Sequence, residues 1–167
     1  MHRQPVLIGE LVSVAPTTAD DHDALYAVAA DPAIWDQHPA HDRWQPEVFR
    51  AFFDEGLATG GMLTIRDAAD GAVIGATRYV PAGPQAVEIG WTFLARSHWR
   101  RGYNRELKRL MIDHALTQVD AVRFSAGVDN HRSRRAIEAL GATQLPDAMV
   151  ERGGQIVPRV LYELRRA

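Results

Sequence analysis

The sequence predicts an α+β fold with three layers, in which a mixed, mostly antiparallel sheet lies between helices on both of its faces. Segments with apolar residues at helical spacing are interspersed with shorter segments in which apolar and polar residues alternate. Turn signals such as Asp70-Gly71 and Gly153-Gly154 join alternating segments directly, which favours antiparallel pairing. No linker, repeat or low-complexity segment divides the chain, so we expect one domain that spans residues 1–167.

The composition supports one sizeable core and argues against several classes of protein. The chain of 167 residues is 46% hydrophobic, and its net charge of −2 argues against a nucleic-acid or membrane-surface binder. It contains no cysteine, which excludes a disulfide, a thiolate metal site and a cysteine nucleophile within it. No signal peptide or long apolar run is visible, so we expect a cytoplasmic protein without a membrane span.

Capping residues predict where the helices begin, and alternation predicts the strands. Thr17 or Thr18 is the N-cap of a first helix, Pro46 starts a second, and Asn130 caps the last, which Gly141 ends in a left-handed conformation. A further helix follows a basic loop in the second half of the chain. The expected strands are residues 6–14, 62–66, 73–80, 87–94, 122–128, 149–152 and 156–164.

The basic loop runs from Ser97 to Arg105 and is the most informative stretch of the sequence. Gly102 lies in it, flanked by Arg100, Arg101 and Arg105. A helix N-terminus offers unpaired backbone N–H groups and a positive dipole end. The guanidinium of one arginine can also bind two phosphate oxygens in a bidentate manner. The loop therefore predicts a phosphate or pyrophosphate site.

The strand before this loop carries a carboxylate beside a glycine. Strict alternation places one set of side chains on its apolar face, namely Val87, Ile89, Trp91 and Phe93. It places Glu88, Gly90 and Thr92 on the opposite face, where the absence of a side chain at Gly90 lets a ligand approach the backbone.

Strand, loop and the next helix together resemble the GCN5-related N-acetyltransferase (GNAT) superfamily, and within it the RimJ/RimL-like branch. The motifs that carry the resemblance are Glu88-Ile89-Gly90-Trp91, Trp99-Arg100-Arg101-Gly102-Tyr103-Asn104, and Asn130-x-x-Ser133 followed by Leu140-Gly141. Most of the chain is covered, and the specific part is about residues 86–142. The resemblance implies that the central strands, around Glu88 and Ser125, splay apart to admit acetyl-CoA, and that no metal takes part.

The resemblance also implies roles for individual residues. Glu88 would be the general base that deprotonates a primary amine before it attacks the thioester directly, and Ser133 would help to protonate the departing thiolate. The residues expected at the cofactor are Thr92, Phe93, Leu94, Arg100, Arg101, Gly102, Tyr103, Asn104, Arg105, Asn130 and Ser133. The residues expected at the amine acceptor, a protein N-terminus or a small molecule, are Trp35, His38, Trp44 and Glu88.

Two positions depart from the pattern of the family. Asn104 replaces a small residue of the loop, and because asparagine tolerates a positive φ better than most residues, we expect the turn to survive. Ile137 stands where many members carry the tyrosine that protonates the thiolate, so this acid is missing here.

Several alternatives stay open on the sequence alone. Glu88 is also compatible with a solvated strand carboxylate, Ser133 with a helix-start serine, and the two tryptophans of the acceptor segment with core packing. His38 and His41 could suggest a metal site, but no organised set of carboxylates accompanies them, which favours a pocket-lining loop.

A non-catalytic acyl-CoA-binding or RNA-docking domain of the same fold fits the sequence as well. A dinucleotide-binding oxidoreductase does not fit, because Gly-x-Gly-x-x-Gly is absent. The sequence leaves a homodimer open.

Overall fold

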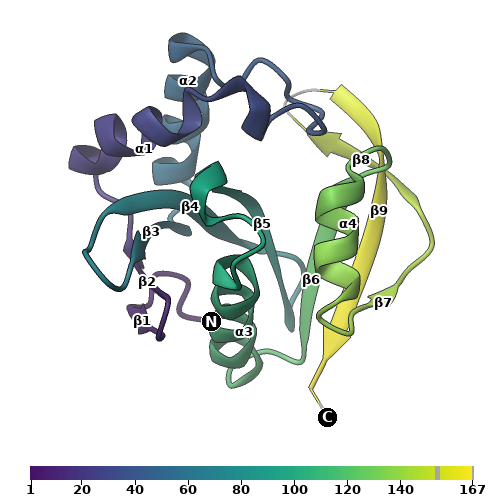
Figure 1. Ribbon diagram of the computed structural model, residues 1–167. Coiled ribbons are helices and arrows are strands. Elements are labelled where there is room, and N and C mark those ends of the chain that lie inside the picture. The colour runs from purple at the N-terminus through teal and green to yellow at the C-terminus, as the bar shows by residue number, and fades with distance from the viewer. Residues whose placement is uncertain (153–154, 167) are drawn as a thin grey trace.

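The computed structural model describes residues 1–152 and 155–166, which form a nine-stranded sheet flanked by helices (Figure 1). The strand order is β1-β2-β3-β4-β5-β6-β9-β7, and β8 also pairs with β9. The strands are β1 Leu7–Ile8, β2 Val12–Pro16, β3 Met62–Asp67, β4 Val73–Pro81, β5 Ala86–Leu94, β6 Ala121–Gly127, β7 Thr143–Gln144, β8 Ala148–Arg152 and β9 Gln155–Arg165. Of the described pairs, β5 with β6 is parallel and the others are antiparallel, so the mixed, mostly antiparallel sheet is confirmed.

Helices α1 and α2 cover one face of the sheet, and α3 and α4 cover the other (Figure 1). The helices are α1 His22–Ala29, α2 Pro46–Ala58, α3 Tyr103–Leu116 and α4 His131–Glu138, with 3₁₀ turns at Ala19–Asp21, Pro32–Ile34 and Arg96–His98. Thr18 is the N-cap of the turn that leads into α1, Pro46 lies in the first turn of α2, and Asn130 caps α4. The predicted helix starts are therefore confirmed.

The sheet separates two apolar clusters, one on each face. Under α3 and α4 the cluster includes Tyr79, Leu107 and Met111, and under α1 and α2 it includes Phe49 and Phe93. Burying a large apolar side chain stabilises a fold by about 1.5–3 kcal/mol. These two clusters hold each helix pair on its own face and so fix the helix N-termini relative to the strands.

The N-terminal segment differs from the expectation, because residues 6–14 form a hairpin rather than one strand. The Gly9 N–H donates to the carbonyl of Val12 at 2.8 Å, and this turn separates β1 from β2. Strand β7 was not predicted, since two residues are too few to show alternation. The C-terminal hairpin forms from β8 and β9 as expected, although Gly153 and Gly154 lie outside the described residues.

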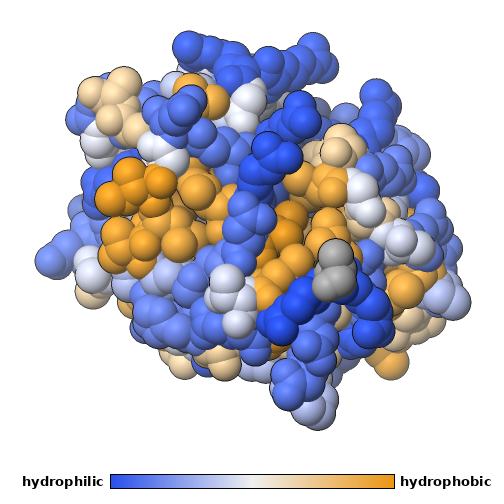
Figure 2. Space-filling view, turned by 90° about the horizontal axis from the view of Figure 1, so that it is seen from below, coloured by the Kyte–Doolittle hydropathy of each residue, from blue (hydrophilic) through white to orange (hydrophobic). Residues whose placement is uncertain are grey.

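Apolar side chains also reach the surface, in patches between bands of hydrophilic ones on the face seen from below (Figure 2). Val6 and Ile8 are exposed at the end of the sheet formed by β1. This edge strand is only 2 residues long, which limits its pairing with another chain. Within the described ranges, no helix is both long and apolar enough to cross a bilayer.

Candidate active site

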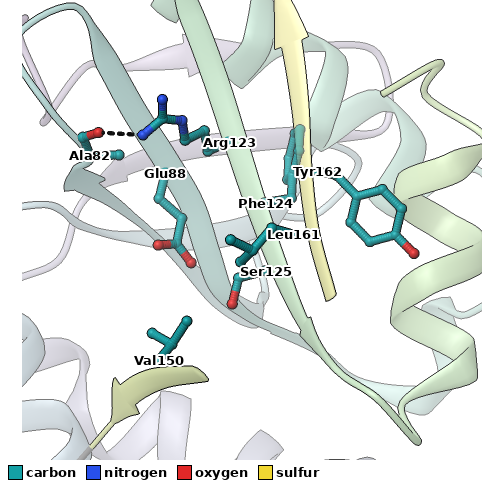
Figure 3. A pocket seen from close by; sticks show the side chains of 8 residues that line it. All are labelled: Ala82, Glu88, Arg123, Phe124, Ser125, Val150, Leu161 and Tyr162. Carbon is teal, nitrogen blue, oxygen red and sulfur yellow. Dashed lines mark hydrogen bonds between the residues drawn. The ribbon is translucent and has the colours of Figure 1, made fainter. Parts of the chain in front are cut away.

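Strands β5 and β6 separate soon after they begin to pair, and a cavity opens beside that point. The paired residues are Ala86 with Ala121, Val87 with Val122, and Glu88 with Arg123. The cavity has a volume of about 220 Å³ and is lined by Ala82, Glu88, Arg123, Phe124, Ser125, Val150, Leu161 and Tyr162 (Figure 3). The splay expected around Glu88 and Ser125 is therefore present.

Glu88 and Ser125 face the cavity from the two separating strands (Figure 3). A Cβ atom at Gly90 would meet only the Glu88 Oε1 within 4 Å, at 3.5 Å, apart from neighbours in the chain. The backbone at Gly90 is thus open to a ligand, as predicted. The gap combines a carboxylate, a hydroxyl and accessible peptide groups, which are the elements that acid–base chemistry on a bound carbonyl compound needs.

A bulge in β5 changes which side chains share a face. The register with β4 shifts within this stretch, and Trp91 has a φ of 51°. Val87 and Ile89 pack under α3, whereas Trp91 and Phe93 pack on the side of α1 and α2. The prediction that these four side chains share one face is wrong, because one extra residue inverts the alternation. Thr92 consequently points toward α3, away from the face of Glu88.

A buried lysine and two hydroxyls tie this bulge to helix α3. Lys108, the single lysine of the chain, donates to the Thr92 Oγ1 at 2.5 Å, and that oxygen lies 2.8 Å from the Thr77 Oγ1. Lys108 is 7% exposed, and burial lowers its pKa to about 7. Lys108 was not predicted to be a functional residue, although a signal was present: it is a charged residue next to Leu107, on the stripe of α3 that faces the core.

The loop before α3 contains two left-handed residues. Arg100 has a φ of 58° and Gly102, the N-cap of α3, has a φ of 90°. Successive backbone N–H groups in such left-handed turns, together with the N–H groups of a first helical turn, are the kind of geometry that binds anions. A Cβ on Gly102 would lie 3.3 Å from the Leu11 Cδ1. The turn survives as predicted, but Asn104 does not hold it: Asn104 lies inside α3 without a positive φ.

Hydrogen bonds fix this loop to the sheet. Asp67, at the end of β3, accepts from the Tyr103 hydroxyl at 3.0 Å and lies 3.1 Å from the His98 Nε2. The Trp99 Nε1 donates to the carbonyl of Leu94 at 2.9 Å, which links the loop to the end of β5. The Tyr103 side chain is turned into the protein, so its backbone is the part that can face a phosphate. The exposed arginines of the loop are Arg100, Arg101 and Arg105.

Helix α4 begins near the gap, and its first turn is organised by Asn130. The Asn130 Oδ1 accepts from the backbone N–H of Ser133 at 3.1 Å, and the partly exposed Ser133 follows the cap. Ile137 is buried in the core and supplies no acid. The Tyr162 hydroxyl donates to the Glu138 carboxylate at 2.8 Å, and its ring points toward α4 rather than into the gap (Figure 3). Tyr162 therefore does not replace the missing tyrosine in this arrangement.

The segment from Trp35 to Trp44 lies on the side of α1 and α2. Trp35 is 2% exposed and its Nε1 donates to the carbonyl of Ala29 at 2.9 Å, whereas Trp44 is 38% exposed. Burial, followed by the charge of Arg43, lowers the pKa of His38 to about 3, so this ring is neutral at ordinary pH. Residues 1–152 and 155–166 contain no cluster of three or more His, Asp or Glu side chains that could hold a metal.

Comparison with known proteins decides the family. A family model for an acetyltransferase (GNAT) domain matches residues 12–143. The chain belongs to the GNAT acetyltransferase family. Members of this family use acetyl-CoA. A comparison with curated proteins gives no sequence match.

Solved GNAT structures share the fold across nearly the whole chain. A GCN5-related N-acetyltransferase from Brucella melitensis has a TM-score of 0.83 at 18% identity, covering 97% of this chain and 79% of that one. RimJ from Mycobacterium smegmatis, in complex with CoA-disulfide, has a TM-score of 0.71 at 14% identity, covering 92% and 81%. Spermidine N-acetyltransferase from Vibrio cholerae, in complex with CoA and spermine, has a TM-score of 0.71 at 12% identity, covering 94% and 96%. At these identities the likeness establishes the fold, which is the predicted one.

The left-handed Gly102 gives a test of the loop. Gly102→Ala should cost about 1–2 kcal/mol in backbone strain and should also weaken acetyl-CoA binding, because the new Cβ alters the anion site. Gly60→Ala is the matched control, since Gly60 has a φ of 64°, meets only the Arg3 Nη2 at 4.0 Å from its Cβ position, and lies between α2 and β3. Calorimetric titration should show weaker binding for Gly102→Ala only. Equal affinity of both variants for acetyl-CoA would show that the loop is not part of the cofactor site.

Lys108 gives a test of buried charge through the pH dependence of stability. Its folded-state pKa of about 7 lies below the ordinary 10.5, so between these pH values the unfolded chain binds the extra proton and rising pH stabilises the folded protein. Lys108→Met should raise the free energy of unfolding by on the order of 1–4 kcal/mol at pH 6, and the gain should shrink toward pH 10. Urea titrations at several pH values measure this. A gain that is independent of pH would show that Lys108 titrates normally.

Proposed function

We propose that this protein transfers the acetyl group of acetyl-CoA to a primary amine by direct attack, and that it belongs to the RimJ/RimL-like branch of the family. One observation carries the proposal: the strands flanking Glu88 and Ser125 part, and the anion-binding loop before α3 follows β5 directly. A thioester lying in this gap would have its phosphates at the loop and its acetyl group near Glu88. Residues 1–167 act as one domain in this proposal.

Backbone groups and arginines hold acetyl-CoA in the proposed complex. The pyrophosphate accepts from N–H groups of the turn at Gly102 and the first turn of α3, which includes Tyr103 and Asn104, while Arg100, Arg101 and Arg105 supply charge. The pantetheine arm runs along β5 from Thr92 to Leu94 and passes Asn130 and Ser133. In this stretch β5 has no described partner on the side of β6, so its peptide groups can bond to the ligand.

The reaction requires a neutral amine and a stabilised oxyanion. Glu88, directly or through a water molecule, takes a proton from the ammonium group of the acceptor, and the amine nitrogen then attacks the thioester carbonyl carbon. Backbone N–H groups at the β5 bulge stabilise the negative charge that develops on the carbonyl oxygen. The new C–N bond forms as the C–S bond breaks, and the thiolate takes a proton with help from Ser133, because Ile137 cannot donate one. Holding both reactants in the gap contributes up to roughly 7–11 kcal/mol to lowering the barrier.

Glu88→Gln tests the base. The substitution keeps size and hydrogen bonding but removes basicity, so kcat/KM at pH 7 should fall by roughly 10²-fold or more. The deficit should shrink as pH rises, because more of the amine arrives already neutral. Thiol release from acetyl-CoA with an amine panel measures turnover, and calorimetry should show unchanged cofactor affinity.

The control is Glu47→Gln, which neutralises an exposed carboxylate in the first turn of α2. It should leave both measurements unchanged. A deficit of Glu88→Gln that stays constant with pH would assign Glu88 to acceptor binding rather than proton transfer. Acetyl-CoA binding without thiol release on any amine would instead favour the non-catalytic acyl-CoA-binding domain.

A further inference from the structure

On the face of the sheet covered by α1, α2 and the acceptor segment, the guanidinium of Arg43 is partly buried against aromatic rings. Arg43 places its Cζ 4.3 Å from the ring centroid of Phe52 and 5.2 Å from that of Trp35. Among the residues whose side chains are described, 1–151 and 156–166, Arg43 has no hydrogen bond or ion pair. Burial, then the charge of Arg78, lowers the pKa of Arg43 to about 10, although the carboxylates of Glu55 and Asp42 act in the opposite direction, so the group stays cationic at neutral pH. Aromatic rings compensate a desolvated cation only in part.

A second guanidinium lies on the same aromatic ring. The Cζ of Arg78 is 5.0 Å from the Phe52 centroid and 5.2 Å from the Trp91 centroid, and Arg78 is 1% exposed. It donates to the carbonyl of Phe52 at 3.1 Å and contacts the Glu55 carboxylate at 3.5 Å. Helix α2 makes room for this group, because a Cβ at Gly56 would lie 2.8 Å from the Arg78 Nη2. The two like charges share one site despite their mutual repulsion.

Two more arginines lie near the acceptor segment, and one of them reaches the cavity. Arg159 donates from its Nε to the Ser125 Oγ and from its Nη2 to the Ser125 carbonyl, both at 2.9 Å, and Ser125 lines the cavity with Glu88. Arg132 bonds to the Asp36 carboxylate at 3.2 Å, so its charge is balanced locally. The charges of Arg43, Arg159 and Arg132 all lower the pKa of His38, which places this ring among them.

Arg43 and its neighbouring arginines lie apart from the loop that is proposed to bind the cofactor phosphates. Arg43 packs on the rings of α2 and the acceptor segment, on the face opposite α3. The acceptor segment closes over the end of β6, since a Cβ at Gly127 would lie 2.8 Å from the Pro39 Cγ. The anion site of the cofactor loop lies at the N-terminus of α3, on the other face. Arg43 therefore lies on the face of the acceptor segment and not on the face of the cofactor loop.

We propose that the acceptor amine also carries an acidic group, a carboxylate or a phosphate, and that Arg43 binds it. The inference rests on the proposed function, and it names the substrate class. An anion at Arg43 would offset the desolvated charge and bind through charge-assisted hydrogen bonds. The amine end of the same molecule would lie toward the Glu88 carboxylate, so a molecule with both charges matches the site. A polyamine such as spermidine, with no acidic group, would be repelled by the arginines.

Matched pairs of amines test the acidic group directly. The common L-amino acids are compared with the amines that lack only their carboxylate, and O-phosphoethanolamine is compared with ethanolamine; spermidine is included. The readout is kcat/KM from thiol release. We expect the acidic member of at least one pair to exceed its neutral partner by tenfold or more, and the pairs distinguish carboxylate from phosphate. Equal rates within every pair would overturn the inference, as would preference for spermidine.

Variants of Arg43 assign the preference to this residue. Arg43→Met keeps an apolar stem but removes the charge, and it should reduce the acidic-to-neutral ratio of kcat/KM toward one. Arg43→Lys should restore part of the ratio. Arg50→Met is the matched control, because Arg50 is an exposed arginine of α2 that contacts Asp54 at 3.8 Å, and it should leave the ratio unchanged. An unchanged ratio in a folded Arg43→Met protein would refute the assignment.

Failure of this inference can be told apart from failure of the proposed function. If the protein binds acetyl-CoA and acetylates neutral amines but not acidic ones, the proposed function stands and the inference of an acidic acceptor fails. If the protein binds acetyl-CoA but releases no thiol with any amine, both the proposed function and the inference of an acidic acceptor fail. Inorganic phosphate and acetate serve as bare probes in the absence of turnover: each should raise the melting temperature of the wild type more than that of Arg43→Met. Equal shifts would count against Arg43 as the anion site.

Discussion

The short parallel pairing of β5 with β6 is the constraint on which the site depends. The two strands are paired from Ala86 to Glu88 and then diverge, while β4 holds β5 and β9 holds β6 along their outer sides. Because each strand is fixed by its antiparallel neighbour, the gap cannot close by one strand sliding toward the other. Backbone N–H and C=O groups along the gap still need partners, and an extended ligand with amide groups can supply them.

The bulge in β5 shows how local geometry and buried charge cooperate. One extra residue turns Trp91 toward α1 and α2 and Thr92 toward α3, where Lys108 and Thr77 bond to it. An amine with no carboxylate beside it is costly in a core. The bulge and its lysine contact therefore have to be held in place by the packing of α3, and this packing also sets the position of the turn at Gly102.

The two faces of the sheet carry separate electrostatic tasks. At the N-terminus of α3, backbone N–H groups and exposed arginines favour phosphate oxygens, and their charge is screened by solvent. On the opposite face the guanidinium of Arg43 is held against aromatic rings and is less screened, so in the proposed complex it would respond more strongly to the charge of a ligand. In the proposed complex the amine and acetyl-CoA approach Glu88 from these two sides of the sheet.

The sequence by itself determined the local elements: the caps at Thr18 and Asn130, the glycine turn at Gly102, and the motifs that indicate the GNAT family, because these depend on residues close together in the chain. Tertiary structure alone decided the bulge at Trp91, since strict alternation holds only while each residue of β5 has one partner on β4. It also decided the neighbours of Lys108 and Arg43. The Lys108 contact joins residues 16 positions apart, and the Arg43 contacts bring aromatic rings from different elements around one charge; no local pattern encodes such neighbours.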